Sequence, residues 1–149
     1  METKEITTRT RKAVLAEYLK LKVETIEDVY RSGFIVNDQE WRVLTNEEAE
    51  QATEACIADS LWAFNCGFLV SYMPDMPGEN EQWERTKKAI LKMQGTLCED
   101  ANPIIRALIA DRYEDFVEDA ICADGRGHFL SGYDGEEVAL KGGLFGYRI

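Results

Sequence analysis

The sequence contains little of what metal centres and disulfide frameworks are made from. It has one histidine, and its four cysteines are separated by 10, 32 and 24 residues, so it contains no Cys-x-x-Cys pair. These spacings exclude the usual Cys/His zinc motifs and favour free, buried thiols at Cys56 and Cys66. A four-thiolate site assembled from distant positions is the one alternative left open. We therefore predict no metal and no cofactor.

Long apolar runs are also missing. The longest nearly uncharged stretch spans 14 residues, from Leu61 to Pro74, whereas a helix needs about 20 apolar residues to cross a bilayer. The opening METKEITTRTRK lacks the apolar core of a signal peptide. We therefore expect a soluble, cytoplasmic protein with no membrane partner.

Positive charge is scarce beyond the first third of the chain. The net charge is −11; residues 1–42 hold eight Lys/Arg and eight Asp/Glu, whereas residues 43–149 hold nine and 20. Such a surface repels nucleic acid and attracts basic partners, so we expect no direct nucleic-acid binding. Selection for solubility alone also accounts for this composition.

The 149 residues, 45% of them apolar, suit one domain with a real core and show no internal repeat. Periodicity predicts a helix over 8–31 ended by Gly33, then a hairpin of strands 34–36 and 41–44 around the turn 37–40. Thr45 and Glu48 form a capping box that starts a long helix reaching residue 72. Further helices are predicted over 79–97 and over 101–125, and short strands over 128–131 and 144–149.

This pattern predicts a mainly α fold. We expect a four-helix compact domain with a minor β component, namely the hairpin near 34–44 and C-terminal strands within 127–149. Residues 1–149 then form a single helical domain with a C-terminal β-hairpin tail. The two β regions are expected to pair into one small sheet.

The first candidate site is an acidic stripe on the last predicted helix. Its members recur at i, i+3, i+4, i+7 and i+8 and therefore share one helix face; they are Asp111, Glu114, Asp115, Glu118 and Asp119. Their spacing resembles the phosphate spacing of a nucleic-acid strand, which favours a partner-binding face that imitates nucleic acid. A solvated face, partly neutralised by Arg106 and Arg112, and a divalent-metal site are the alternatives.

The second candidate is DGRGHFLSGYDGEE, residues 124–137, which surrounds the single histidine with glycines and carboxylates. In a catalytic interpretation His128 is a general base and Ser131 a nucleophile. The carboxylate that orients the histidine is then one of Asp124, Asp134, Glu136 or Glu137. On a strand, however, His128 and Ser131 point to opposite faces, and no GxSxG or phosphate-loop pattern is present. The alternative is turn chemistry in which His128 hydrogen-bonds its neighbours.

An aromatic set is the third candidate. Helical spacing predicts that the set is core, and an exposed ligand pocket or a partner groove is the alternative. Its members are Trp41, Trp62, Phe64, Phe68, Tyr72 and Trp83.

Two stretches carry a resemblance. WRVLTNEEAEQATEACIADSLWAFNCGFL, residues 41–69, and DGRGHFLSGYDGEE with the terminal YRI resemble small acidic proteins of unassigned function from tailed-phage and other mobile-element genomes. The similarity covers roughly residues 40–149. It implies an origin and supplies neither an activity nor site residues.

Three hypotheses follow. The first is a non-enzymatic phage or mobile-element protein that binds a host protein with a basic surface, as a nucleic-acid mimic that inhibits a defence or transcription factor in the host cytoplasm. The second is a small enzyme or ligand-binding domain that uses the His128 region. The third is an oligomeric structural protein. The sequence does not fix the oligomeric state.

Overall fold

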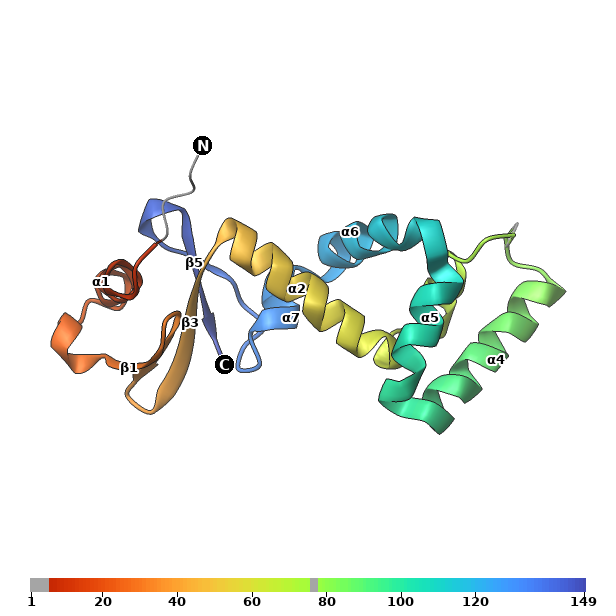
Figure 1. The fold of residues 1–149 in the computed structure, drawn as a ribbon, viewed down its shortest axis with the longest axis horizontal. Helices are drawn as coiled ribbons and strands as arrows, with labels where there is room; N and C mark the ends of the chain where they lie inside the picture. Colours follow the sequence, from red (N-terminus) through yellow and green to blue (C-terminus); the bar gives the residue numbers. More distant parts are fainter. Residues whose placement is uncertain (1–5, 76–77) are drawn as a thin grey trace. The chain divides into compact units, whose positions relative to one another are not determined.

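The computed structural model describes residues 6–75 and 78–149 and is drawn in Figure 1. The chain divides into two compact units, which we describe separately. Unit 1 combines Met1–Thr53 with Asp124–Ile149, and unit 2 is Glu54–Ala123. The fold is mainly α with a β component, as the sequence indicates. The single domain of residues 1–149 stays a prediction.

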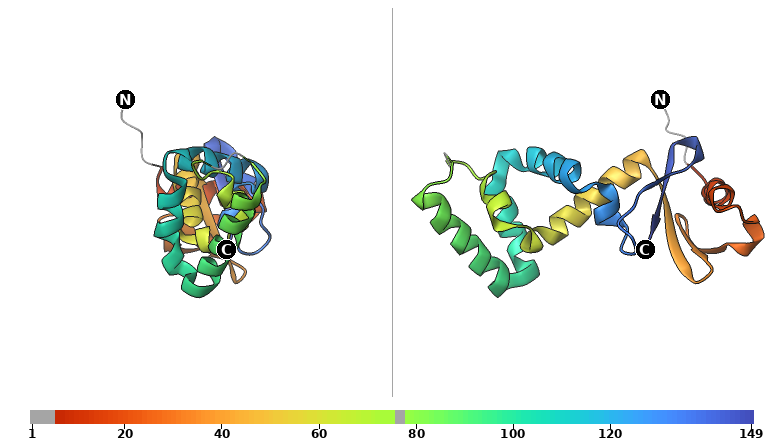
Figure 2. Two further views of the ribbon diagram at one scale, coloured as in Figure 1. Left: turned by 90° about the vertical axis from the view of Figure 1, so that its right-hand side faces the viewer. Right: turned by 180° about the vertical axis from the view of Figure 1, so that it is seen from behind.

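Unit 1 is built on an antiparallel sheet in the order β1-β2-β3-β5-β4. Its strands are β1 Glu27–Tyr30, β2 Gly33–Val36, β3 Gln39–Thr45, β4 Val138–Ala139 and β5 Leu144–Arg148. The C-terminal β5 pairs with β3 of the hairpin, with Val43 opposite Gly146, and the rear view of Figure 2 shows the two strands together. The expectation that the two β regions form one sheet is therefore confirmed.

Both faces of this sheet are covered by helices of unit 1. On one face, side chains such as Phe34 and Val43 pack against Leu15 of α1 (Thr8–Leu19). On the other, Leu44 and Tyr147 pack against the first turn of α2 (Asn46–Ser60) and against α7 (Arg126–Leu130). Alternate residues along a strand point to opposite faces, which explains how adjacent Val43 and Leu44 are both buried.

The predicted helix over 8–31 is too long. Thr7 caps α1 by accepting a hydrogen bond from the Thr10 amide, and the helix ends where Lys20 adopts a φ of 58°. A 3₁₀ turn, η1 (Val23–Thr25), follows, and β1 then pairs with β2. Gly33 begins β2 and ends no helix. The misreading arose because apolar β-branched and aromatic residues at 26, 29 and 30 fit both a helical and a strand period.

The hairpin prediction is confirmed, and the strand predicted over 128–131 is wrong. Asn37 and Asp38 take φ values of 49° and 65° between β2 and β3, as a tight two-residue hairpin turn requires. Residues 126–130 instead form α7, which follows Gly125 at a φ of 82°. A Cβ on Gly127 would lie 2.4 Å from the Gly135 carbonyl oxygen. The close approach of these two backbones holds α7 in place. A 3₁₀ turn, η5 (Lys141–Gly143), joins β4 to β5.

Unit 2 is helical. After the second half of α2 come η2 (Leu61–Ala63), α3 (Cys66–Val70), α4 (Glu81–Leu97) and η3 (Cys98–Ala101). The chain continues through α5 (Asn102–Ile109), η4 (Ala110–Arg112) and α6 (Tyr113–Asp124). The helix predicted over 79–97 is confirmed as α4, with Asn80 accepting a hydrogen bond from the Trp83 amide at 2.9 Å.

Two long helices predicted in this region are each broken. The helix expected to reach residue 72 ends at Ser60, and the Asn65 side chain caps the new helix α3 by accepting from the Phe68 amide. The helix expected over 101–125 is interrupted at Ala110, which has a φ of 54°. The four-helix count is therefore wrong: the described residues form seven α-helices, five of which have at least eight residues.

Candidate functional site

The acidic stripe lies on two consecutive elements, a correction to its placement on one helix. Asp111 is in η4, and the other four members are on α6. The break at Ala110 separates Asp111 from the regular face because it precedes the first residue of α6. All five side chains are exposed. We call Asp111, Glu114, Asp115, Glu118 and Asp119 the acidic face.

The opposite side of α6 fixes the direction of this face. Phe116, Val117 and Ala120 are buried. The Phe116 ring packs against Phe64 and Phe68, with centroids 5.2 and 5.3 Å away. Because these apolar side chains anchor α6 within unit 2, the carboxylates at the intervening positions point into solvent.

Arg106 and Arg112, which the sequence offers as neutralising groups, form no ion pair with the acidic face. Arg106 lies over the Tyr113 ring, 4.2 Å from its centroid. Arg112 lies over the Tyr72 ring at 4.9 Å and donates to the Ser71 carbonyl at 3.0 Å. Across residues 6–75 and 78–149, no ion pair joins a cation to any carboxylate of the acidic face.

One member of the acidic face has a neutral partner. The Tyr72 phenol donates a hydrogen bond to Asp119. Burial, together with this hydrogen bond to a carboxylate, raises the pKa of Tyr72 to about 12. The phenol therefore stays protonated at neutral pH and holds Asp119 in one orientation without removing its charge.

The candidate residues of segment 124–137 lie on several elements. Asp124 ends α6, His128 is on α7, Ser131 follows α7, and Asp134, Glu136 and Glu137 lie in the turn before β4. The His128 side chain is exposed, and within the described chain it contacts the Phe129 ring and makes no hydrogen bond or ion pair. The expectation that it hydrogen-bonds its neighbours is wrong.

Ser131 and Asp134 contact each other and not His128. The Ser131 hydroxyl lies 2.9 Å from Asp134 Oδ1 and 2.7 Å from the Arg148 carbonyl oxygen. Hydrogen bonds from the Glu136 amide and from Ser131 lower the pKa of Asp134. The structure therefore uses this serine and aspartate to hold the turn against β5, and it does not bring His128 to the hydroxyl.

The contacts of Glu137 also stabilise the fold. It pairs with Arg126, with Oε2 2.8 Å from Nε, and it accepts a hydrogen bond from the Tyr147 phenol at 2.5 Å. Burial raises the pKa of Glu137, but the bonds from Arg126 and Tyr147 outweigh it, so the pKa is lowered. Arg126 further donates to Asn46 at the start of α2. The cluster ties α7, β5 and α2 together within unit 1.

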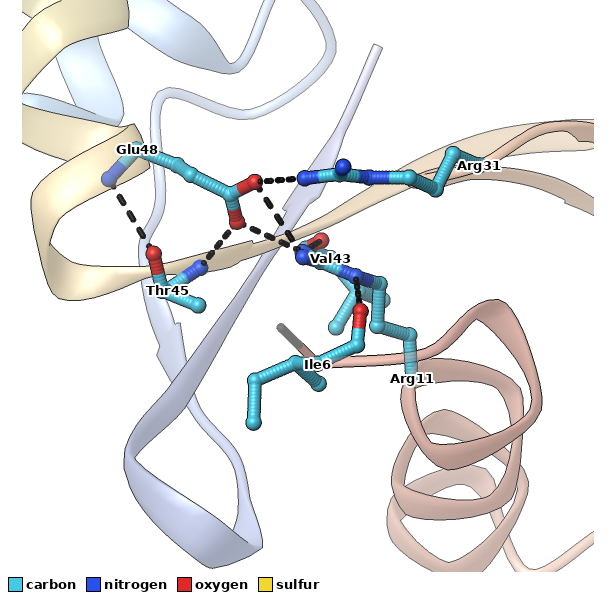
Figure 3. Close-up of polar contacts among 6 residues, drawn as sticks. All are labelled: Ile6, Arg11, Arg31, Val43, Thr45 and Glu48. Atoms are coloured by element: carbon cyan, nitrogen blue, oxygen red, sulfur yellow. Dashed lines mark hydrogen bonds and ion pairs between the residues drawn. The ribbon is translucent and has the colours of Figure 1, made fainter. Parts of the chain in front are cut away.

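Arg11, the most buried charged side chain among the described residues, was not predicted from the sequence. Arg11 of α1 is 1% exposed and binds Glu48 through Nη1 at 2.6 Å and Nη2 at 3.1 Å. Figure 3 shows Glu48 also receiving bonds from Arg31 and from the Thr45 amide. The capping box predicted at Thr45 and Glu48 is confirmed by the return bond from the Glu48 amide to the Thr45 hydroxyl.

The cluster of Glu48 with Arg11, Arg31 and Thr45 stabilises the fold of unit 1. Burial alone raises the pKa of Glu48, but the bonds from Arg11, Thr45 and Arg31 lower it to about 2. Arg11 also donates to the Val43 and Ile6 carbonyls. The only sequence signal for Arg11 is its position four residues before Leu15, on the helix side that faces the sheet.

The last candidates from the sequence are the aromatic set and the cysteines. Of the aromatic set, Trp41 and Tyr72 are buried, and the other four are half-buried. Among the described residues no disulfide joins the four cysteines; Cys56 and Cys66 are half-buried, and Cys98 and Cys122 are exposed. The described residues contain no group of three or more His, Cys, Asp or Glu side chains placed to hold a metal ion. In the same ranges, none of the helices combines the length and the apolar character needed to cross a membrane.

Comparison of the chain with family models, curated proteins and solved structures found no match.

Proposed function

We propose that this is a phage or mobile-element interaction protein that binds a basic surface on a host protein through the acidic face. The observation that carries the proposal is that these five carboxylates are exposed and have no cationic partner in the described chain. A partner that supplies lysines or arginines would make the ion pairs that the chain itself leaves unmade.

The spacing of the carboxylates favours a partner that normally holds nucleic acid. Glu114, Asp115, Glu118 and Asp119 occupy six consecutive positions of α6, which cover about 7.5 Å at a rise of 1.5 Å per residue. That is one carboxylate for roughly every 2.5 Å of axis, close to the phosphate spacing of about 3.4 Å along one DNA strand. Competition with nucleic acid for a groove of a host defence or transcription factor is the proposed mode of inhibition.

The charge of unit 2 supports the same partner class. Residues 54–123 contain 13 Asp/Glu and six Lys/Arg, a net charge of −7 within the chain total of −11. A field of this sign accelerates the encounter with basic proteins and weakens as salt is added. The proposed location, host cytoplasm, is where such partners bind their nucleic acids.

Affinity capture from bacterial lysate tests the proposal. The baits are the wild type and a variant in which the acidic face is reversed by Asp111→Lys, Glu114→Lys, Asp115→Lys, Glu118→Lys and Asp119→Lys, each checked for folding by circular dichroism. We expect the wild type alone to retain a nucleic-acid-handling protein at low salt and to release it at high salt. Equal retention by both folded baits, or retention by the wild type that salt does not weaken, contradicts the proposal.

A further inference from the structure

A second surface of the molecule lies at the edge of the unit 1 sheet. Among the described strands, β1 pairs with β2 alone and is the first strand in the sheet order. All four of its residues are exposed, so neither face of the strand is covered. Its outer edge therefore offers backbone amides and carbonyls to an added strand.

Exposed apolar side chains are frequent on β1 and in the segment that leads into it. Of the 11 large apolar side chains that are exposed in the described chain, five lie between residues 18 and 30. They are Tyr18, Leu21, Val23, Val29 and Tyr30. Val29 and Tyr30 are on β1 itself and are 51% and 45% exposed. An unpaired edge next to apolar side chains is the arrangement that binds extended peptides by strand addition.

The edge strand is held in shape by its own hairpin. The Tyr30 ring lies against Gly33 so closely that a Cβ on that glycine would be 2.2 Å from Tyr30 Cε1. Val29 has no partner in β2, because the register shifts between Asp28 and Tyr30. The hairpin therefore positions the strand, and Val29 lies at an irregular point of its pairing with β2.

The charges of β1 indicate which kind of chain can pair with its edge. Asp28 pairs with Lys12, with Oδ1 2.9 Å from Nζ, whereas Glu27 has no ion-pair partner among the residues the structure describes. A second copy of this chain would place Glu27 and Asp28 near their own equivalents and would add another net charge of −11. Like charges across a strand pair are destabilising, so self-association is disfavoured.

We propose that the β1 edge binds an extended segment of a partner protein that pairs as an added strand, places a Lys or Arg near Glu27 and packs β-branched side chains against Val29 and Tyr30. Backbone hydrogen bonds supply much of the affinity in this mode, and the flanking side chains supply selectivity. This surface is separate in the chain from the acidic face, and neither proposal depends on the other.

The test is a peptide titration of the full chain followed by amide NMR. The probe is an end-blocked Lys-Val-Thr-Val-Lys-Val peptide, and the control is the same peptide N-methylated at every residue, which keeps the charges and side chains but donates no backbone hydrogen bonds. We expect shifts and slowed hydrogen exchange at the amides of residues 27–30, and binding at least tenfold weaker for the methylated peptide.

Two variants locate the contact. Val29→Pro removes the amide of the β1 residue that has no Cα partner in β2, and we expect it to abolish the effect while circular dichroism stays unchanged. Glu27→Lys should weaken peptide binding about two- to fivefold, whereas the matched Glu79→Lys, an exposed position in unit 2, should leave it unchanged.

Three results overturn the proposal. In the first, the two peptides bind equally, which makes the interaction one of charge alone. In the second, the shifts appear on α6 and not on β1. In the third, the amides of residues 27–30 shift with protein concentration before peptide is added, which makes a second copy the occupant.

Discussion

The two units use their carboxylates differently. In unit 1, Glu48 binds Arg11 and Arg31, and Glu137 binds Arg126. In unit 2, Arg106 and Arg112 lie on tyrosine rings while the acidic face stays exposed and without a cation. The same residue types thus hold helices to a sheet in one unit and form an open charged surface in the other.

A count of charges does not distinguish carboxylates that stabilise the fold from carboxylates that are exposed on its surface. The carboxylates of unit 1 meet arginines that come from distant parts of the chain, and such pairs are costly to break when one partner is buried. Apart from Asp119, which accepts a hydrogen bond from Tyr72, those of the acidic face interact with solvent, so their loss costs the fold little. Mutations at the two places should therefore separate stability from binding.

The largest effect is expected at Glu48. Glu48→Gln leaves the Arg11 guanidinium buried without its counter-charge, so the free energy of unfolding should fall by about 3 kcal/mol. Urea denaturation followed by circular dichroism measures it. Glu47→Gln, at the exposed neighbouring position, is the matched control and should change stability by no more than about 0.5 kcal/mol. Equal effects at the two positions would show that the Arg11–Glu48 pair does not stabilise unit 1.

The next effect tests the close backbone contact of unit 1 against an open helix position of unit 2. Gly127→Ala places a Cβ 2.4 Å from the Gly135 carbonyl oxygen and should destabilise the protein by about 2 kcal/mol. Gly95 of α4 has nothing within 4 Å of an added Cβ, so Gly95→Ala should stabilise by about 0.5 to 1 kcal/mol. Thermal unfolding of both variants gives the comparison, and a neutral Gly127→Ala would refute the contact.

The pH dependence isolates part of the Glu48 contribution. Its folded pKa of about 2 lies below its ordinary value of 4.5, so its stabilisation is fully present above pH 4.5 and is lost as the pH falls toward 2. The free energy of unfolding of the wild type should therefore fall over this window more steeply than that of Glu48→Gln. Parallel profiles would assign the acid sensitivity to other groups.

The smallest effect is expected on the acidic face. Glu114→Gln and Glu118→Gln together remove one i, i+4 repulsion and should leave the free energy of unfolding within about 0.5 kcal/mol of the wild type. A loss comparable to that of Glu48→Gln, measured in the same denaturation assay, would mean that these carboxylates hold the fold and are not a free surface.

Local chemistry made part of the fold predictable. The Thr45–Glu48 capping box, the hairpin turn within 37–40 and the helix over 79–97 all depend on side chains a few residues apart, and all three were confirmed, although the turn itself takes only Asn37 and Asp38. The break at Ala110, where φ is 54°, carries no sequence signal, because alanine favours helix.

The candidate sites were predictable to a similar extent. The exposure of α6 follows from its apolar period, so the acidic face could be located from sequence apart from the place of Asp111. Segment 124–137 could not, because Gly127 reads as a helix breaker until the backbone of residues 135–137 is placed against it. Two partners of Arg11, Val43 and Glu48, are 32 and 37 residues away, which no local pattern reveals.

The most direct test of the central claim measures the dissociation constant of a captured partner by calorimetry for three forms of the protein. They are the wild type, the variant with the acidic face reversed, and a control in which five other exposed carboxylates are changed to lysine, giving the same net charge. The control positions are Glu24, Glu79, Glu99, Asp100 and Glu136. The account predicts that binding is lost in the acidic-face variant and largely kept in the control, with a steep salt dependence for the wild type. Equal weakening in both variants would contradict it, because net charge and not the acidic face would then determine the affinity.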